Sequence, residues 1–249
     1  MGGPLPFRPG GALSGAAQPQ YPANVAQVDE SQACPCGCGA QLPALVAGRE
    51  RGLRAETAAA AAGAPRPARE HAAAFLITGV PGAGKSSAGR LLALQFGQSA
   101  HIDIDLVFHH FTVAGRAAPE DTGPDTARQA ELAVANAAAM ARNYLDAGYA
   151  CVLEGAVATR AQVRAGQRAL APHPLHLVVL APPPEVSEQR DAQRSGKHVA
   201  PHFRHLQPLL ASELAGLGLW LDNGGQSLPE TVEEIWARRA EARLRAATL

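Results

Sequence analysis

The sequence predicts a three-layer α/β fold with a five-stranded parallel sheet, formed by residues 72–249 of the 249-residue chain. Two observations predict it. From about Ala72 onward, short apolar runs alternate with amphipathic segments, which is the pattern of repeated strand and helix units. The first apolar run passes through a glycine-rich loop directly into a helical pattern, as expected where a parallel strand leads into its crossover helix. We therefore expect one folded domain over residues 72–249.

Residues 1–71 are expected to form a low-complexity, largely disordered region, because a segment rich in Gly, Pro, Ala and Gln buries too little apolar surface to offset the entropy of ordering. This region holds Cys34, Cys36 and Cys38 in the segment CPCGC. Zinc at this cluster is unlikely, because a structural zinc site needs four ligands and no second cysteine pair follows. A fragment of a zinc-binding motif and a soft-metal or redox site remain the alternatives. Cys151 is expected to be a buried, apolar side chain.

Five apolar runs are expected as strands. In chain order they are AAFLITG (73–79), SAHIDIDLVF (99–108), YACVLEG (149–155), LHLVVLAPPP (175–184) and GLWLDN (218–223). Three helical patterns are clear between and after them. They cover residues 86–97, with Leu91, Leu92 and Phe96 inward and Gly97 as the stop, residues 125–147, closed by Gly148, and residues 229–246, with Pro229 at the start.

The loop GVPGAGKSS, residues 79–87, matches the phosphate-binding spacing G-x-x-x-x-G-K-[ST]. The match is informative because only Lys85 and Lys197 of the 22 basic residues are lysines, and because the loop lies between a strand and a helix. Glycines let the backbone wrap around phosphate oxygens, and the N–H groups at a helix start favour negative charge. Lys85 is expected to reach the β and γ phosphates, and the Ser86 hydroxyl to bind Mg²⁺. The nucleotide-binding residues predicted are Gly79, Val80, Pro81, Gly82, Ala83, Gly84, Lys85, Ser86 and Ser87.

With this motif, residues 72–249 resemble the P-loop NTPases. Asp103 and Asp105 are expected at the end of the second strand, where alternate residues share a face and both carboxylates could point into one site. One carboxylate would position Mg²⁺ through water and the other would orient an acceptor hydroxyl. In the alternative, these acids only cap the following helix.

The order of P-loop, D-x-D and later arginine pair resembles the small P-loop kinases of the shikimate, gluconate and chloramphenicol phosphotransferase type. The resemblance implies that Asp105 engages the acceptor and that Asp103 lies on the metal side. It implies that residues 188–198 form a mobile lid, in which Arg190 and Arg194 act on the transferred phosphate. The alternative is a solvated basic turn that pairs with Glu185 or Glu188.

Three further features are assigned to the same site. Glu154 ends the third strand and is expected to support Mg²⁺, through a water, or to face the acceptor. The loop NGGQSLPE, residues 223–230, lies where these kinases pass close to the adenine. One of His109 and His110 could line the acceptor pocket, since neighbours on a helix face different ways.

The function expected is an ATP-dependent phosphotransferase that uses Mg²⁺ and ATP as cofactors and takes a small-molecule hydroxylated acceptor. Zero formal net charge gives no support for nucleic-acid or membrane-surface binding, and no apolar run is long enough to span a bilayer, so a cytoplasmic protein is expected. The alternatives are a nucleotide-dependent switch or regulatory module and a nucleotide-binding module without catalysis. No second acid follows VLE at residues 152–154, and no additional helical domain is expected, which argues against an AAA-type motor.

Overall fold

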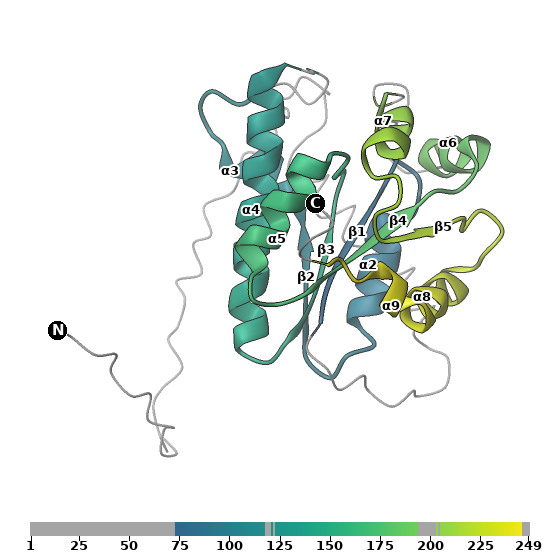
Figure 1. Cartoon of the computed structure of the whole chain (residues 1–249). Coiled ribbons are helices and arrows are strands. Elements are labelled where there is room, and N and C mark those ends of the chain that lie inside the picture. The colour runs from purple at the N-terminus through teal and green to yellow at the C-terminus, as the bar shows by residue number, and fades with distance from the viewer. Residues whose placement is uncertain (1–72, 118–120, 122, 194–202, 204, 246–249) are drawn as a thin grey trace, which may run out of the picture.

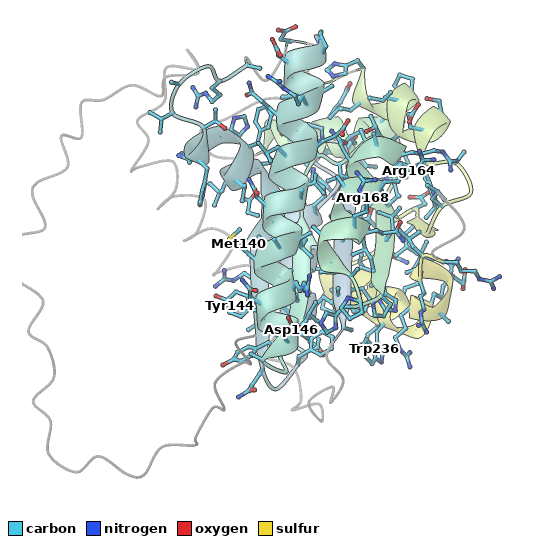
Figure 2. The ribbon with its side chains drawn as sticks, turned by 60° about the vertical axis from the view of Figure 1, so that its left-hand side comes forward. Met140, Tyr144, Asp146, Arg164, Arg168 and Trp236 are labelled. Carbon is cyan, nitrogen blue, oxygen red and sulfur yellow. The ribbon has the colours of Figure 1, made fainter. Side chains whose placement is uncertain are left out.

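A computed structural model describes residues 73–117, 121, 123–193, 203 and 205–245 of the chain. Five parallel strands form one sheet in the order β2-β3-β1-β4-β5, with helices on both faces (Figure 1). The strands are β1 (Ala74–Gly79), β2 (Ser99–Asp103), β3 (Ala150–Glu154), β4 (Leu175–Leu180) and β5 (Leu219–Leu221). The three-layer α/β fold with a five-stranded parallel sheet is therefore confirmed.

Helices cover the two faces of the sheet and bury a separate core on each. One core joins alternate strand residues, such as Leu76 and Leu153, to α4 (Pro124–Asp146), α5 (Arg160–Leu170) and α7 (Leu206–Glu213). The other joins Phe75 and Val152 to α2 (Lys85–Ala93) and α8 (Leu228–Ala237). Because strand side chains alternate between the faces and both faces are covered, the central strands are apolar over most of their length.

The remaining helices are short and flank these layers. They are α3 (Ile104–Phe111), α6 (Pro184–Ala192) and α9 (Arg239–Ala242). None of the helices within the described ranges is both long enough and apolar enough to cross a membrane.

The second predicted strand, residues 99–108, is wrong in its second half. β2 ends at Asp103, whose Oδ1 accepts hydrogen bonds from the backbone N–H groups of Asp105 (2.9 Å) and Leu106 (3.2 Å). An Asp side chain in this position satisfies the free N–H groups of a helix start, and the apolar residues that follow belong to α3. Asp105 therefore lies in the first turn of a helix and not on a strand.

Two helix boundaries and one further helix differ from those expected. The helix after the P-loop ends at Ala93, although Phe96 is buried as predicted. The C-terminal helix is broken at Arg238 into α8 and α9. Helix α5 was not expected, and it begins with a capping box in which Thr159 and Gln162 bond each other's backbone N–H groups.

Several predicted features fall outside the described residues. They are the N-terminal region 1–71 with its cysteine cluster, and Arg194, Lys197 and His198 of the lid segment. The boundary between the N-terminal region and the folded domain at residues 71 and 72 stays a prediction.

Candidate active site at the carboxyl edge of the sheet

The predicted site residues on three strands meet at one edge of the sheet. Gly79 ends β1, Asp103 ends β2 and Glu154 ends β3. Asp103 and Glu154 are direct partners in the β2/β3 register, and Glu154 is the partner of Ile77 on β1. Because the strands are parallel, their carboxyl ends open on the same edge, where ligands of α/β sheets bind.

The loop that follows β1 has the backbone that the glycine spacing predicts. Gly82 and Gly84 have φ angles of 82° and 92°, which an L side chain rarely adopts. A Cβ at Gly82 would overlap the Ser187 carbonyl oxygen of α6, and one at Gly79 would overlap the Leu180 carbonyl oxygen of β4. Gly79 and Gly82 are therefore required by the packing of the loop as well as by its backbone conformation, and Gly84 by its backbone conformation.

Lys85 and the start of α2 supply the positive charge of the loop. The Lys85 side chain is buried, and its Nζ donates to the Val80 carbonyl at 3.2 Å, which also accepts from the Ala83 N–H at 3.1 Å. The N-cap of α2 is Gly84, which has no side chain to cap the first turn. A buried ammonium at the start of a nine-residue helix is a donor set that suits phosphate oxygens.

The Asp105 side chain, in the first turn of α3, contacts the loop that follows β3. Its Oδ1 accepts a hydrogen bond from the Ala156 N–H at 3.2 Å. A Cβ at Gly155 would lie 2.8 Å from the Ile104 Cβ and 3.2 Å from the same Oδ1, so glycine is needed for this approach. The structure thus brings Asp105 against the two residues that follow Glu154, although not by the strand alternation that we expected.

Asp103 and Glu154 are held differently from each other. One oxygen of Asp103 caps α3, as the structural alternative proposed. Glu154, the last residue of β3, is buried, with 1% of its surface exposed. No three His, Cys, Asp or Glu side chains of the described residues converge well enough to hold a metal by themselves. Mg²⁺ bound with a nucleotide needs only one or two protein oxygens, with phosphates and waters as its other ligands, so Ser86, Asp103 and Glu154 still fit that ion.

Arg190 is found against the predicted adenine loop. Its Nη2 donates to the carbonyl oxygens of Asn223 (3.0 Å) and Gly224 (3.3 Å) in the loop between β5 and α8. Both bonds are made by Nη2, and a guanidinium also has N–H donors on Nη1 and Nε. Its predicted partner Arg194 lies outside the described residues.

Two buried polar side chains at this edge were missed from the sequence. The Thr78 hydroxyl donates to the Val157 carbonyl (2.7 Å) and accepts from the Val157 N–H (3.1 Å), which ties β1 to the loop after β3. Asn223 is 5% exposed, and its Nδ2 donates to the Ala83 carbonyl of the P-loop at 3.0 Å. Asn223 is 140 residues from Ala83, so no local pattern could have revealed the pair.

The remaining predicted side chains are placed as follows. His109 is half-buried and His110 is exposed, and a role of either in the acceptor pocket stays a prediction. Burial raises the pKa of the Cys151 thiol to about 11, and its position inside β3 confirms the apolar role expected for it.

A family profile described as "AAA domain" matches residues 75–212, which is more than half of the chain. The chain belongs to this AAA domain family. The match begins in β1, contains the P-loop and every carboxylate named above, and ends within α7. None of the curated proteins matches this AAA domain protein.

Solved structures that are similar to this AAA domain protein include a sugar kinase and a resistance protein. An unliganded sugar kinase from Janibacter sp. HTCC2649 is 20% identical with a TM-score of 0.56, over 69% of this chain and 96% of that one. The tunicamycin resistance protein of Deinococcus radiodurans is 16% identical with a TM-score of 0.51, over 70% of this chain and 99% of that one. At these identities the likeness concerns the fold, and the resemblance to small P-loop kinases is confirmed at that level.

Proposed function

We propose that the protein is an ATP-dependent phosphotransferase, which transfers the γ-phosphate of Mg-ATP to a hydroxyl of a small-molecule acceptor. The observation that carries the proposal is the arrangement at the sheet edge. The buried Lys85 lies at the start of α2, after the loop that follows β1. Asp103, Asp105 and Glu154 gather at the carboxyl ends of β2 and β3, and β3 lies between β2 and β1 in the sheet. This combination of phosphate donors and carboxylates supports transfer to an acceptor better than it supports nucleotide binding alone.

The P-loop would hold the nucleotide by its phosphates. Residues 79–87 contribute backbone N–H groups, and the Lys85 ammonium would exchange the Val80 carbonyl for the β and γ phosphate oxygens. Ser86 would hold Mg²⁺ directly, with Asp103 and Glu154 acting through water. When bound there, Mg²⁺ neutralises charge on the phosphates.

Asp105 would position the attacking hydroxyl. Its Oδ1 is fixed by the Ala156 N–H, which leaves Oδ2 as the atom that would accept the hydrogen bond and then the proton of the acceptor hydroxyl. Holding the acceptor in line with the γ-phosphate is the main task in phosphoryl transfer. Arg190 and Arg194 would stabilise the charge of the transferred group, and Arg190 would do so through N–H groups other than those it donates to the loop carbonyls.

The test compares two variants with a matched control. Lys85→Ala should weaken ATP binding roughly 10- to 100-fold, because it removes a charge-assisted hydrogen bond. Asp105→Asn keeps an oxygen that accepts from the Ala156 N–H, and should spare ATP binding while it lowers transfer about 100-fold or more. Asp125→Asn, at an exposed position on α4, is the control and should change neither.

Binding is measured as the rise in melting temperature with Mg-ATP. Transfer is measured as the radiolabelled phosphate that moves from ATP to each member of a panel of hydroxylated metabolites and antibiotics. Transfer by Asp105→Asn at the wild-type rate would refute the role of Asp105. ATP hydrolysis with no phosphorylated acceptor from any panel member would favour the nucleotide-dependent switch. No rise in melting temperature with ATP would refute nucleotide binding altogether.

A further inference from the structure

We infer that Asn223 is a positioning residue, whose side-chain amide fixes the peptide between Ala83 and Gly84 so that the Gly84 N–H faces the phosphate site. The inference rests on the proposed function, because it concerns how the P-loop is prepared for a triphosphate. Asn223 belongs to the loop between β5 and α8, outside the P-loop motif.

The direction of the Gly84 N–H follows from the hydrogen bond that Asn223 makes. The Asn223 Nδ2 donates to the Ala83 carbonyl at 3.0 Å. The peptide between Ala83 and Gly84 is trans, since the one cis bond among the described residues is Ala171–Pro172. In a trans peptide the C=O and N–H point in opposite directions, so a carbonyl held toward Asn223 turns the Gly84 N–H away from it. That N–H then joins those at the start of α2, where Gly84 is the N-cap.

Gly84 makes this peptide easy to turn over. Its φ of 92° is available to glycine without strain, but glycine adopts negative φ equally well. A rotation of the Ala83–Gly84 peptide would exchange the two directions and point a carbonyl oxygen at the phosphates. The flexibility of Gly84 that lets the loop wrap a phosphate therefore also requires a contact that holds the Ala83–Gly84 peptide in one orientation, and the Asn223 amide supplies that contact.

Asn223 is itself held firmly on its backbone side. Its carbonyl accepts from the Arg190 guanidinium at 3.0 Å, so α6 fixes the position from which the side chain reaches the P-loop. A Cβ at the neighbouring Gly224 would lie 2.6 Å from Pro183 Cδ, which shows how closely this loop packs on the start of α6.

Folding stability alone gives a poor account of this side chain. Within the described residues, the Asn223 Oδ1 is buried without a hydrogen-bond partner, which is a cost to the folded state. The amide orientation is nevertheless fixed, because only Nδ2 can donate to a carbonyl. An arrangement that buries an unsatisfied oxygen to keep one bond to the P-loop is explained by the geometry that the bond imposes.

The experiment measures binding of three probes to the full chain: ATP, inorganic tripolyphosphate and adenosine. Asn223→Asp keeps the shape of the side chain and loses the donor at neutral pH, and Asn223→Ala removes the side chain. Asn143→Asp, at an exposed position of α4, introduces the same charge away from the site. Melting without ligand reports whether each variant folds, and the isosteric Asn223→Asp preserves the test if the alanine variant does not.

The expected result is an affinity loss on the order of ten-fold for ATP and for tripolyphosphate in both Asn223 variants, with adenosine affinity and the control unchanged. A base-binding or purely structural role would lower adenosine affinity as well, and this outcome would overturn the inference. Wild-type affinity for tripolyphosphate in both variants would also overturn it, while the proposed function would stand. If the wild-type chain bound neither ATP nor tripolyphosphate, the proposed function would fail and the inference with it.

Discussion

Gly82→Ala should destabilise the protein by far more than an alanine at another glycine of similar backbone conformation. Gly82 has a φ of 82°, and an added Cβ would overlap the Ser187 carbonyl oxygen and lie 2.8 Å from its carbon. Gly148, which follows α4, has a φ of 88°, but an added Cβ there meets no atom within 4 Å. An alanine at either glycine therefore has a similar cost from the positive φ, and only an alanine at position 82 has an additional cost from overlap with neighbouring atoms.

The magnitude follows from these two terms. An L residue at positive φ costs about 1–2 kcal/mol, of which about 0.4–1 kcal/mol is recovered because alanine restricts the unfolded chain. Gly148→Ala should therefore lower the free energy of unfolding by about 1 kcal/mol. The overlap at Gly82 involves backbone of α6, which cannot rotate away as a flexible side chain could, and overpacking of this kind adds about 1–3 kcal/mol. Gly82→Ala should therefore cost about 2–4 kcal/mol.

Thermal unfolding by circular dichroism measures the difference. For a domain of this size 1 kcal/mol corresponds to about 2–4 °C, so Gly148→Ala should lower the melting temperature by roughly 3 °C and Gly82→Ala by roughly 6–12 °C. Equal losses in the two variants would refute the reasoning, because they would show that contact with α6 is not what demands a glycine at position 82.

Three further measurements test separate parts of the fold. Burial, with a lesser contribution from Arg243 and Arg239, lowers the pKa of His176 below its usual 6.5. The unfolded chain therefore takes up the proton at a higher pH than the folded chain, and the free energy of unfolding should fall as pH drops below about 6.5. Urea titrations of the wild type and of His176→Gln should show a less steep fall in the variant. Burial raises the pKa of Cys151 to about 11, so mass spectrometry should find its peptide unlabelled by iodoacetamide at pH 8 in the native protein and labelled in urea. Ser227→Ala removes the capping box of α8 and should cost about 1 kcal/mol in chemical denaturation, whereas the exposed Ser212→Ala should cost nothing measurable.

The sequence was sufficient for the sheet because parallel strands with both faces covered are continuous apolar runs. β1, β3 and β4 lie within a residue of their predicted starts for this reason. The second strand was extended too far because IDLVF is as apolar as a strand and gives no sign of its period. The capping preference of Asp103 is the signal that ends the strand, and it corresponds to the alternative in which these acids cap the following helix.

Site residues that belong to a contiguous motif or end an apolar strand can be predicted from the sequence, whereas a side chain defined only by its distant partner cannot. The P-loop is contiguous, so its spacing predicts nine nucleotide-binding residues at once. Gly155 gave no such signal, because its need for glycine arises only when Asp105 of α3 packs against it. Thr78 and Asn223 are paired over 79 and 140 residues, and an isolated Thr or Asn in a sequence does not indicate where its hydrogen bond will go.

These long-range contacts determine the shape of the P-loop. Gly79 is packed against the Leu180 carbonyl at the end of β4, Gly82 against α6, and the Ala83 carbonyl is held by Asn223. Arg190 links the last two supports, since it extends from α6 to the Asn223 carbonyl. A movement of α6 that withdrew Arg190 toward a bound phosphate would therefore loosen the hold on the Ala83–Gly84 peptide at the same time. Phosphate affinity and the position of α6 should then be coupled, and Arg190→Ala should reproduce part of the tripolyphosphate defect of Asn223→Ala without touching the P-loop itself.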